Sequence, residues 1–407
     1  MDWSPQQEKA LALVGEWIER PKKQVFYLAG YAGTGKSTLA RHLSANVSGR
    51  VAFGAFTGKA ALVMRSMGCR DATTIHSMLY VPYDKSTVKL RQLESELKRI
   101  TEEPVDHAMW EPKKLRKMIA AERERLKQPG FELKLNADVR NSSLIVVDEV
   151  SMIDERMGID LEGLGVPILV LGDPAQLPPV KGGGYFTSRT PDFLLTEVHR
   201  HAEGSGIVEL ATSIRAGRRP PRGDYHGSRI IGKSGISVED LLKYDQVLVG
   251  RNATRQRLNS KMRQSLGRTS AYPVAGDRLV CLQNDHDAGL LNGGLFTVLE
   301  DAEGPDDGIM WIHIKDDFDG RKRSVLAHVH PFEGRLDELV GWQRREAQLF
   351  DFGYALTVHK AQGSQWPRVC VVDESRCFPD HAQRWLYTAV TRAQESVDIV
   401  DVNDYLK

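Results

Sequence analysis

The stretch from residue 30 to residue 37 constrains the fold of this chain more than any other. It reads G-Y-A-G-T-G-K-S and matches the pattern G-x-x-x-x-G-K-[ST]. An apolar run at 25–29 precedes it, and a segment able to form a helix follows it, from Ser37 to about His42. A strand, this loop and a helix in that order are the setting in which the pattern marks a phosphate-binding loop. The sequence therefore predicts an α/β domain that binds a nucleoside triphosphate.

The phosphate loop has a chemical role for each of its residue types. Its glycines let the backbone curl so that successive N–H groups point at phosphate oxygens, and the helix adds its positive N-terminal end. Lys36 is expected to reach the β- and γ-phosphates, and the Ser37 hydroxyl is expected to hold Mg²⁺. The predicted cofactors are therefore ATP and Mg²⁺. The residues expected to bind them here are Gly30, Gly33, Thr34, Gly35, Lys36, Ser37 and Thr38.

Two further strand-like runs end in polar side chains that suit the other half of a hydrolytic site. The apolar run 144–147 is followed by Asp148 and Glu149. A carboxylate beside a phosphate loop can hold the Mg²⁺ shell, and a second can orient and deprotonate the attacking water. We therefore assign Asp148 to the metal and Glu149 to the water. The run 167–171 leads into a proline-stiffened loop in which Gln176 is suited to sensing the γ-phosphate.

Composition narrows the class of protein. A chain of 407 residues is expected to hold two to four compact units. Its formal net charge of +1 means that any nucleic-acid site is a local groove, not a consequence of overall charge. The four cysteines form no C-x-x-C pair, so neither zinc nor a disulfide framework is expected. Without a signal peptide or an apolar run of membrane-spanning length, the expected location is the cytoplasm, or the host cytoplasm for a viral protein.

The first half of the chain alternates strand-like runs with helical or loop segments, which is typical of a mostly parallel sheet covered on both faces. Residues from about 84 to 141 break this pattern because they are dense in Lys, Arg and Glu. We interpret them as an insertion with helices at 89–98 and 111–127 and a short strand around 131–135. A solvated protrusion and a contact with nucleic acid are both open roles for this charged arm.

The second half repeats the α/β theme, with strand-like runs at 246–250, 368–372 and 396–400. Between about 276 and 350, short β-like pieces are separated by turn-forming residues, among them the stretch 304–308. This punctuation predicts a small β-barrel inserted in the second α/β domain. A stretch rich in Gly, Pro and Arg, 217–228, predicts a surface loop.

Several further motifs, in order along the chain, resemble those of one helicase family. They lie at 3–10 (the adenine-reading motif), 55–61 (motif Ia), 74–77 (the strand-contact motif that follows), 195–200 (motif IV), 356–363 (motif V) and 387–393 (motif VI). The phosphate loop, Asp148-Glu149 and Gln176 match motifs I, II and III. Over most of its length the chain thus resembles the superfamily 1B DNA helicases of the RecD-like and Dda-like, phage type. Phe56 stands where the family usually has proline, while Thr57 and Lys59 are in place.

This resemblance implies a fold with two RecA-like P-loop NTPase domains. A charged helical insertion would belong to the first domain, and a small SH3-like β-barrel would be inserted in the second. The implied boundaries are 1–83 with 142–194 for the ATP-binding RecA-like domain 1A, 84–141 for the insertion 1B, 195–275 with 351–407 for the RecA-like domain 2A, and 276–350 for the SH3-like domain 2B.

The resemblance also implies site residues beyond the phosphate loop. Gln7 would read the adenine, and Gly363 would line the nucleotide. Arg200 and Arg392 would act beside Lys36, Glu149 and Gln176, because a guanidinium placed at the charge growing on the γ-phosphate accelerates hydrolysis by about 10³–10⁵. The side chains expected to contact the phosphates of a nucleic-acid strand are Thr57, Lys59, His76, Thr357, His359 and Lys360. Phe56 and the pair Tyr185-Phe186 are candidates for stacking on bases.

The implied function is that of an ATP-dependent DNA helicase that travels 5′→3′ on single-stranded DNA and acts at junctions with duplex. We expect a monomer with replication or recombination proteins as candidate partners and no membrane partner. Three alternatives stay open: a translocase that strips proteins from DNA, an RNA-directed ATPase, and a nucleotide-switched nucleic-acid binding or loading module. A nuclease is disfavoured because no acidic set with metal-ligand spacing occurs beyond Asp148-Glu149, and a GTPase because no N-K-x-D string occurs.

Overall fold

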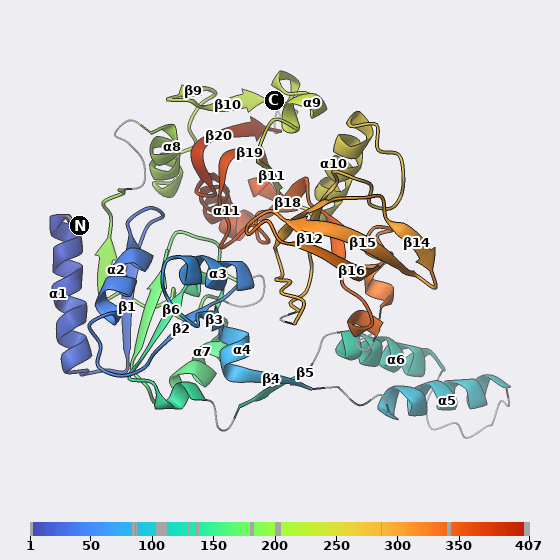
Figure 1. Cartoon of the computed structure of the whole chain (residues 1–407), viewed down its shortest axis with the longest axis horizontal. Coiled ribbons are helices and arrows are strands. Elements are labelled where there is room, and N and C mark those ends of the chain that lie inside the picture. The colour runs from blue at the N-terminus through green and yellow to red at the C-terminus, as the bar shows by residue number, and fades with distance from the viewer. Residues whose placement is uncertain are drawn as a thin grey trace.

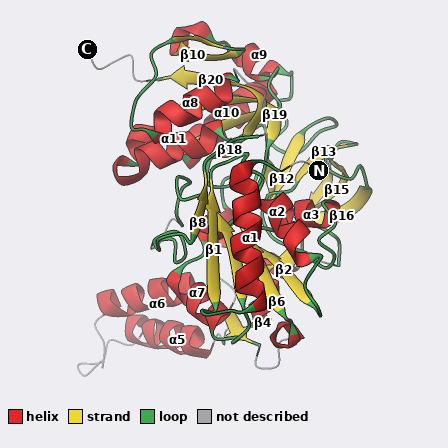
Figure 2. Cartoon of the chain, turned by 90° about the vertical axis from the view of Figure 1, so that its left-hand side faces the viewer, coloured by secondary structure: helices red, strands yellow, loops and turns green. Residues whose placement is uncertain are grey.

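A computed structural model of the chain describes residues 3–83, 86, 88–102, 112–127, 130–134, 138–179, 183–199, 205–285, 287–339 and 343–402. Two mostly parallel sheets, each with its helices, lie one above the other in both views (Figures 1 and 2). We call them the first lobe and the second lobe, in chain order. Within the described ranges, no helix is both long and apolar enough to span a bilayer.

The first lobe is built on parallel strands, as the alternating apolar runs predict. β1 lies next to one edge of the sheet: it pairs with β7 from Val25↔Ile168 to Ala29↔Gly172, and with the edge strand β8 on its other side. In the described part of the chain the order across the sheet is β3 (Thr73–Thr74), β2 (Val51–Ala55), β6 (Leu144–Asp148), β7 (Ile168–Gly172), β1 (Val25–Gly30) and β8 (Phe193–Leu195).

Helices cover both faces of this sheet because successive side chains of a strand point to opposite faces. On β1, Phe26 and Leu28 belong to the apolar cluster with α1 (Pro5–Glu19), α2 (Lys36–Ser44) and α3 (Gly58–Ser66). Tyr27 and Ala29 belong to the cluster with α4 (Ile75–Leu79) and α7 (Glu155–Glu162). The polar motifs begin at the carboxyl ends of these strands.

Between α4 and β6 the chain leaves the sheet. β4 (Tyr80–Tyr83) pairs antiparallel with β5 (Gly130–Leu133), and α5 (Val88–Glu102) packs against α6 (Pro112–Lys127). The two helices lie side by side away from both parallel sheets (Figures 1 and 2). They bury a small apolar cluster of their own, made of Leu93, Ile100, Leu115 and Ile119. The expected helices and strand are therefore present.

The second lobe repeats the parallel arrangement. Among the residues described, its order is β18 (Ala355–Thr357), β11 (Gln246–Val249), β19 (Trp366–Asp373), β20 (Ala393–Asp401), β10 (Ser228–Gly232) and β9 (Gly223–Tyr225). Its helices are α8 (Gly206–Arg215), α9 (Val238–Leu241), α10 (Asn252–Ser265) and α11 (Ala382–Val390). One apolar cluster joins α8 and α11 to the sheet, and another joins the opposite face to α10 and the antiparallel strands described next.

An antiparallel sheet occupies the region between β11 and β18. Its strands are β14 (Glu303–Asp306), β15 (Ile309–Asp316), β13 (Leu295–Val298), β12 (Arg278–Cys281) and β17 (Phe350–Phe352), with β16 (Lys322–His328) also paired to β15.

Two of the sequence-based expectations were wrong in detail. Part of the turn expected at 304–308 is strand β14, and part of the loop expected at 217–228 is strand β9. The reason is that hairpin turns need only two residues with positive φ. Asp307 (φ 47°) and Gly308 (φ 78°) make the first turn, and His226 (φ 43°) and Gly227 (φ 85°) make the second. The residues on either side are free to pair.

Candidate active site

The phosphate loop leaves the carboxyl end of β1 and enters α2. Gly33 and Gly35 both have φ of 83°, in the left-handed region that favours glycine. A Cβ on Gly30 would stand 2.6 Å from the Thr34 hydroxyl, so a larger residue would not fit there. Lys36 donates from Nζ to the carbonyl oxygens of Gly30 and Tyr31, at 2.6 and 3.0 Å, and so lies over the loop.

Gln7 is held against this loop by the start of α1. Its Nε2 donates to the carbonyl of Thr34 at 3.2 Å, and its Oε1 accepts from the N–H of Ser4 at 3.1 Å. Ser4 is the N-cap of α1, and its hydroxyl accepts in turn from the Gln7 N–H, which completes a capping box. The cap therefore fixes the expected adenine-reading side chain beside Thr34.

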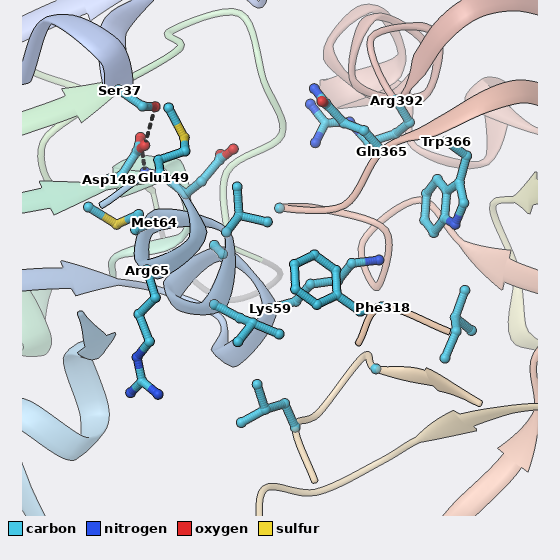
Figure 3. A pocket seen from close by; sticks show the side chains of 18 of the residues that line it. Ser37, Lys59, Met64, Arg65, Asp148, Glu149, Phe318, Gln365, Trp366 and Arg392 are labelled. Carbon is cyan, nitrogen blue, oxygen red and sulfur yellow. Dashed lines mark hydrogen bonds between the residues drawn. The ribbon is translucent and has the colours of Figure 1, made fainter. Parts of the chain in front are cut away.

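The two acidic residues stand at the end of β6, beside the phosphate loop. The Ser37 hydroxyl donates to Asp148 Oδ2 at 2.5 Å, and Figure 3 shows this contact. Glu149 has a positive φ of 56°, which turns the chain as the strand ends. Burial raises the pKa of the Glu149 carboxyl, and the nearby Arg392 acts in the opposite direction. A carboxyl group whose pKa is raised toward neutrality is suited to general-base work.

A hydroxyl and a carboxylate oxygen form the donor set that Mg²⁺ prefers, because this ion binds hard oxygen ligands. Ser37 and Asp148 supply that pair and both line the cleft between the lobes. Gln176, in the loop after β7, lines the same cleft with 6% of its surface exposed. Its Oε1 is buried and has no hydrogen-bond partner among the described residues, so a polar ligand could satisfy it.

The second lobe brings Arg392 to the opposite side of this cleft (Figure 3). Arg392 follows α11 and is 1% exposed. It donates from Nε to the Thr388 carbonyl at 3.1 Å and from Nη1 to the Ser364 carbonyl at 3.3 Å. Gly363 also lines the cleft; its φ is 75°, and a Cβ there would lie 2.8 Å from the Thr57 hydroxyl. The expected Arg200 lies outside the described residues.

The cleft has a volume of about 890 Å³ and is lined by residues of both lobes. Most of the residues expected to bind or hydrolyse the nucleotide line this one cleft. The expected residues that line it are Gly33, Gly35, Lys36, Ser37, Thr38, Lys59, Asp148, Glu149, Gln176, Gly363 and Arg392. Gly30 and Thr34 belong to the phosphate loop but do not line the cleft, and Gln7 contacts the loop at Thr34 from within the first lobe.

The expected strand contacts are spread over several places. Thr57 caps α3, where its hydroxyl accepts from the Ala60 N–H at 3.1 Å. Lys59 lies inside the cleft, with Nζ 5.0 Å from the ring centroid of Trp366. Burial, with a smaller effect from the positive charge of Arg278, lowers the pKa of Lys59 to about 8. Lys59 thus lines the cleft between the lobes, and its expected contact with a nucleic-acid strand stays a prediction.

His76 belongs to a group of four rings that also includes Phe56, Tyr80 and Phe131. The ring centroids of these three side chains lie 5.9, 5.9 and 5.7 Å from that of His76. Burial lowers the pKa of His76, so its ring is neutral at ordinary pH. Phe131 is 39% exposed, so part of this group is open to solvent.

The three expected contacts of the second lobe follow β18. Thr357 is buried, and its hydroxyl accepts from the Lys360 N–H at 3.4 Å. The His359 ring lies 5.5 Å from that of Phe378, and burial lowers its pKa. Lys360 is exposed to solvent. Desolvation by the surrounding protein, followed by the positive charge of Arg255, nevertheless lowers the pKa of Lys360 to about 8. An anion beside a lysine whose pKa is lowered in this way favours the charged form of the lysine and raises its pKa again.

The structure removes one candidate for stacking on bases. Phe186 is fully buried in the core of the first lobe, and Tyr185 packs on it with centroids 5.0 Å apart. A Cβ on Gly158 would lie 2.0 Å from the Tyr185 ring, so that ring covers α7. Phe186 is therefore a packing residue, and the expectation that it stacks on bases was wrong. Tyr185 is only partly buried, so stacking on this ring stays a prediction.

Sequence reasoning missed several residues at or beside the phosphate loop. Asp173 begins the loop after β7 and lines the cleft, while Tyr387 and Arg215 contact the phosphate loop from the second lobe. Tyr387 stands five residues before Arg392, within the string that resembles motif VI, and this proximity was the one available signal. Arg215 carried none, because a lone arginine in a helix is usually a surface residue.

Comparison with known proteins gives a consistent result. Residues 4–229, more than half of the chain, match the family described as AAA domain, and residues 352–400 match the UvrD-like helicase C-terminal domain. The ATP-dependent RecD2 DNA helicase of Deinococcus radiodurans is 28% identical over 399 residues, covering 90% of this chain and 46% of that protein. The RecBCD enzyme subunit RecD of Mycobacterium tuberculosis is 26% identical over 445 residues, covering 92% and 66%. The chain thus spans about half of the length of the first relative and about two thirds of the second.

Solved structures share the fold. Pif1 helicase from Candida albicans superposes with a TM-score of 0.55 at 19% identity, covering 99% of this chain and 95% of that one. Bacteroides Pif1 bound to single-stranded DNA superposes with a TM-score of 0.53 at 16% identity, covering 98% of this chain and 92% of that one. At these identities the likeness concerns the arrangement of the helices and strands.

Proposed function

This chain belongs to the AAA-domain family and is similar to RecD2 and Pif1 helicases, and we propose that it is a superfamily 1B helicase that couples ATP hydrolysis to movement along single-stranded DNA and to strand separation. The observation that carries the proposal is the cleft between the lobes. Lys36, Asp148 and Glu149 come from the first lobe, and Arg392 comes from the second. Hydrolysis at such a site depends on how the two lobes are placed, which is what a motor requires.

The chemistry follows from the charges that phosphoryl transfer creates. Negative charge on the γ-phosphate oxygens is stabilised by the Lys36 ammonium and the Arg392 guanidinium. Mg²⁺, when held by Ser37 and Asp148, would neutralise further phosphate charge. Glu149 takes the proton of the attacking water, and the amide of Gln176 senses the γ-phosphate. Gln7, beside Thr34, reads the adenine.

A strand would be held by both lobes, so that their relative motion moves it. We assign its phosphate contacts to Thr57, His76, Thr357, His359 and Lys360, and place Lys59 at the border between strand and nucleotide. Phosphate contacts fix position without reading sequence, so little sequence preference is expected. The partly exposed ring of Phe131, beside His76, offers a surface for a base.

The division into domains is part of this proposal. Residues 1–83 with 142–194 and 195–275 with 351–407 would form the two RecA-like domains, 276–350 an SH3-like barrel, and 84–141 an inserted arm. The antiparallel sheet formed by strands β12, β13, β14, β15, β16 and β17 supports the barrel assignment, and the packing of α5 on α6 supports the arm. We propose that the arm stands at the junction where duplex is opened.

Partial-duplex DNA with either a 5′ or a 3′ single-stranded tail tests the proposal in the presence of ATP and Mg²⁺. Strand separation with the 5′ tail alone is the expected result, and separation with the 3′ tail alone would reverse the direction. ATP hydrolysis stimulated by single-stranded DNA without any strand separation would favour a translocase. Stronger stimulation by RNA than by DNA would favour an RNA-directed enzyme.

A binding or loading module makes a different prediction for Glu149→Gln. Such a module would keep its function in this variant while retaining bound ATP, because it needs the nucleotide but not its hydrolysis. A motor with the same substitution must stop. Strand separation by the variant, compared with the parent chain under the same conditions, separates the two.

A further inference from the structure

The loop that follows β7 starts in the first lobe but is anchored in the second. Leu177 is 1% exposed and belongs to the apolar core that includes Trp385 and Leu356. Its N–H donates to the Thr388 hydroxyl at 2.9 Å, and its carbonyl accepts from Gln362 Nε2 at 3.0 Å. The position of this loop is therefore set by α11 and by the segment after β18.

The hydroxyl of Tyr387, on α11, joins this loop to the phosphate loop. It donates to Asp173 Oδ2 at 2.8 Å and accepts from the N–H of Ala32 at 3.2 Å. A tyrosine hydroxyl has one proton and two lone pairs, so it can make both contacts at once. Tyr387 is 1% exposed and Asp173 is 2% exposed, so water does not compete for either side chain.

The protonation state of this hydroxyl is fixed by its surroundings. Burial, followed by the negative charge of Asp173, raises the pKa of Tyr387 well above its ordinary value. The hydroxyl therefore keeps its proton at any physiological pH and always donates to Asp173. The other carboxylate oxygen of Asp173, Oδ1, accepts from the Ala175 N–H at 2.9 Å, which holds the carboxylate in place.

The same end of α11 holds Arg392. Arg392 Nε donates to the carbonyl of Thr388, the residue that follows Tyr387. A displacement of Tyr387 relative to the phosphate loop would therefore displace the guanidinium as well. A second contact reinforces this region, since the Arg215 guanidinium lies 3.6 Å from the ring centroid of Tyr31 in the phosphate loop.

We propose that Tyr387 is a positioning residue for hydrolysis, whose hydroxyl sets where Arg392 stands relative to the phosphate loop, with Asp173 as its fixed partner. The inference rests on the proposed ATP hydrolysis and adds to it a residue that does not touch the reacting atoms. Tyr387 contacts the loop backbone at Ala32 and leaves Lys36, Ser37 and Gln7 untouched. Its loss should therefore lower kcat and leave the KM for ATP close to that of the parent.

The test measures steady-state ATP hydrolysis with saturating single-stranded DNA for the parent, Tyr387→Phe, Asp173→Asn and the double variant, together with the Tm of each. Tyr387→Phe keeps the buried ring and removes only the hydroxyl. We expect kcat to fall about tenfold or more, because a tenfold change needs only about 1.4 kcal/mol at the transition state. The KM for ATP is expected to change less than about threefold. Asp173→Asn should likewise lower kcat and leave the KM for ATP nearly unchanged. The kcat of the double variant should be no lower than that of the slower single variant, since the two residues act through one contact.

Tyr244→Phe is the matched control, because its hydroxyl also donates to a buried aspartate, Asp398, remote from the cleft. It should lower Tm without changing kcat. A kcat for Tyr387→Phe equal to that of Tyr244→Phe would overturn the inference and leave the proposed function standing. Should Tyr387→Phe not fold, an unchanged kcat in Asp173→Asn would overturn it equally. A parent chain without DNA-stimulated hydrolysis would overturn both.

Discussion

The hydroxyl of Ser37 donates a hydrogen bond of 2.5 Å to Asp148, although 111 residues separate them in the chain. The pairing of β1 with β7, and of β7 with β6, brings the ends of all three strands to one edge of the sheet. The phosphate loop, the acidic pair and the loop of Gln176 begin at that edge. The metal side of the proposed site is thus complete within the first lobe, and only the arginine has to come from elsewhere.

Replacing Lys36 by alanine should strongly reduce ATP hydrolysis, both with and without DNA. We expect kcat to fall by about 100-fold or more, the usual cost of removing one group that stabilises transition-state charge. Lys22→Ala removes an exposed lysine outside the cleft and serves as the control. Phosphate release measured for the three chains checks this, and hydrolysis by Lys36→Ala at the rate of Lys22→Ala would contradict the assignment.

Arg392→Gln should lower kcat by about 10³-fold while ATP still binds, because the guanidinium acts on charge that develops only during transfer. Glutamine retains much of the side-chain volume at this buried position. Arg376, which is exposed and next to α11, provides the control Arg376→Gln. Measuring the binding of a fluorescent ATP analogue together with turnover separates a loss of ATP binding from a loss of catalysis. Unchanged turnover in Arg392→Gln would remove the second lobe from the catalytic site.

The rate of hydrolysis should depend on pH through Glu149. Burial raises the pKa of this carboxyl, and only the deprotonated form can accept a proton from water. As pH falls, kcat should therefore begin to decline above the range in which an ordinary glutamate titrates. The profile of kcat against pH checks this. A profile that stays flat down to the ordinary range of glutamate would assign the proton to another acceptor.

Binding of single-stranded DNA should take up protons near pH 8. Burial lowers the pKa of Lys360 to about 8, and a phosphate beside it favours the charged form and raises that pKa again. Affinity should therefore decrease as pH rises through 8 and beyond. Calorimetric titration in two buffers of different ionisation enthalpy measures the uptake. In the Lys360→Arg variant the side chain stays charged at every pH tested, so the proton uptake on DNA binding should be smaller. Equal uptake by parent and variant would place the proton elsewhere.

Phe131→Ala should weaken binding of single-stranded DNA by about tenfold or more, because stacking of a base on an aromatic ring contributes about 1–3 kcal/mol. Phe131 is 39% exposed beside His76 and Tyr80. Trp311, 46% exposed on the antiparallel sheet, provides the control Trp311→Ala. Fluorescence anisotropy with a labelled oligonucleotide measures both. Equal affinities for the two variants would argue against stacking at Phe131.

Much of the nucleotide site could be predicted from the sequence because its parts are local. Residues 30–37 form a loop whose geometry depends on their own glycines, and Asp148 ends a strand of apolar residues. Strands of four or more apolar residues were also predictable from their runs. The strands β9 and β14 were missed because their pairing depends on two-residue turns, which composition alone does not distinguish from longer loops. The contact of Lys59 with Trp366 could not be predicted, because the two residues belong to different lobes and lie far apart in the chain.

The sequence by itself determined which chemical groups are present and which of them begin at strand ends, since those features depend on neighbours within a few residues. The tertiary structure alone decided which groups face one another across the cleft. Tyr387 meets Ala32 from 355 positions away, and Leu177 is buried in the core of the other lobe. Contacts of this kind arise from the packing of two separately formed sheets, and no local pattern of residues encodes that packing.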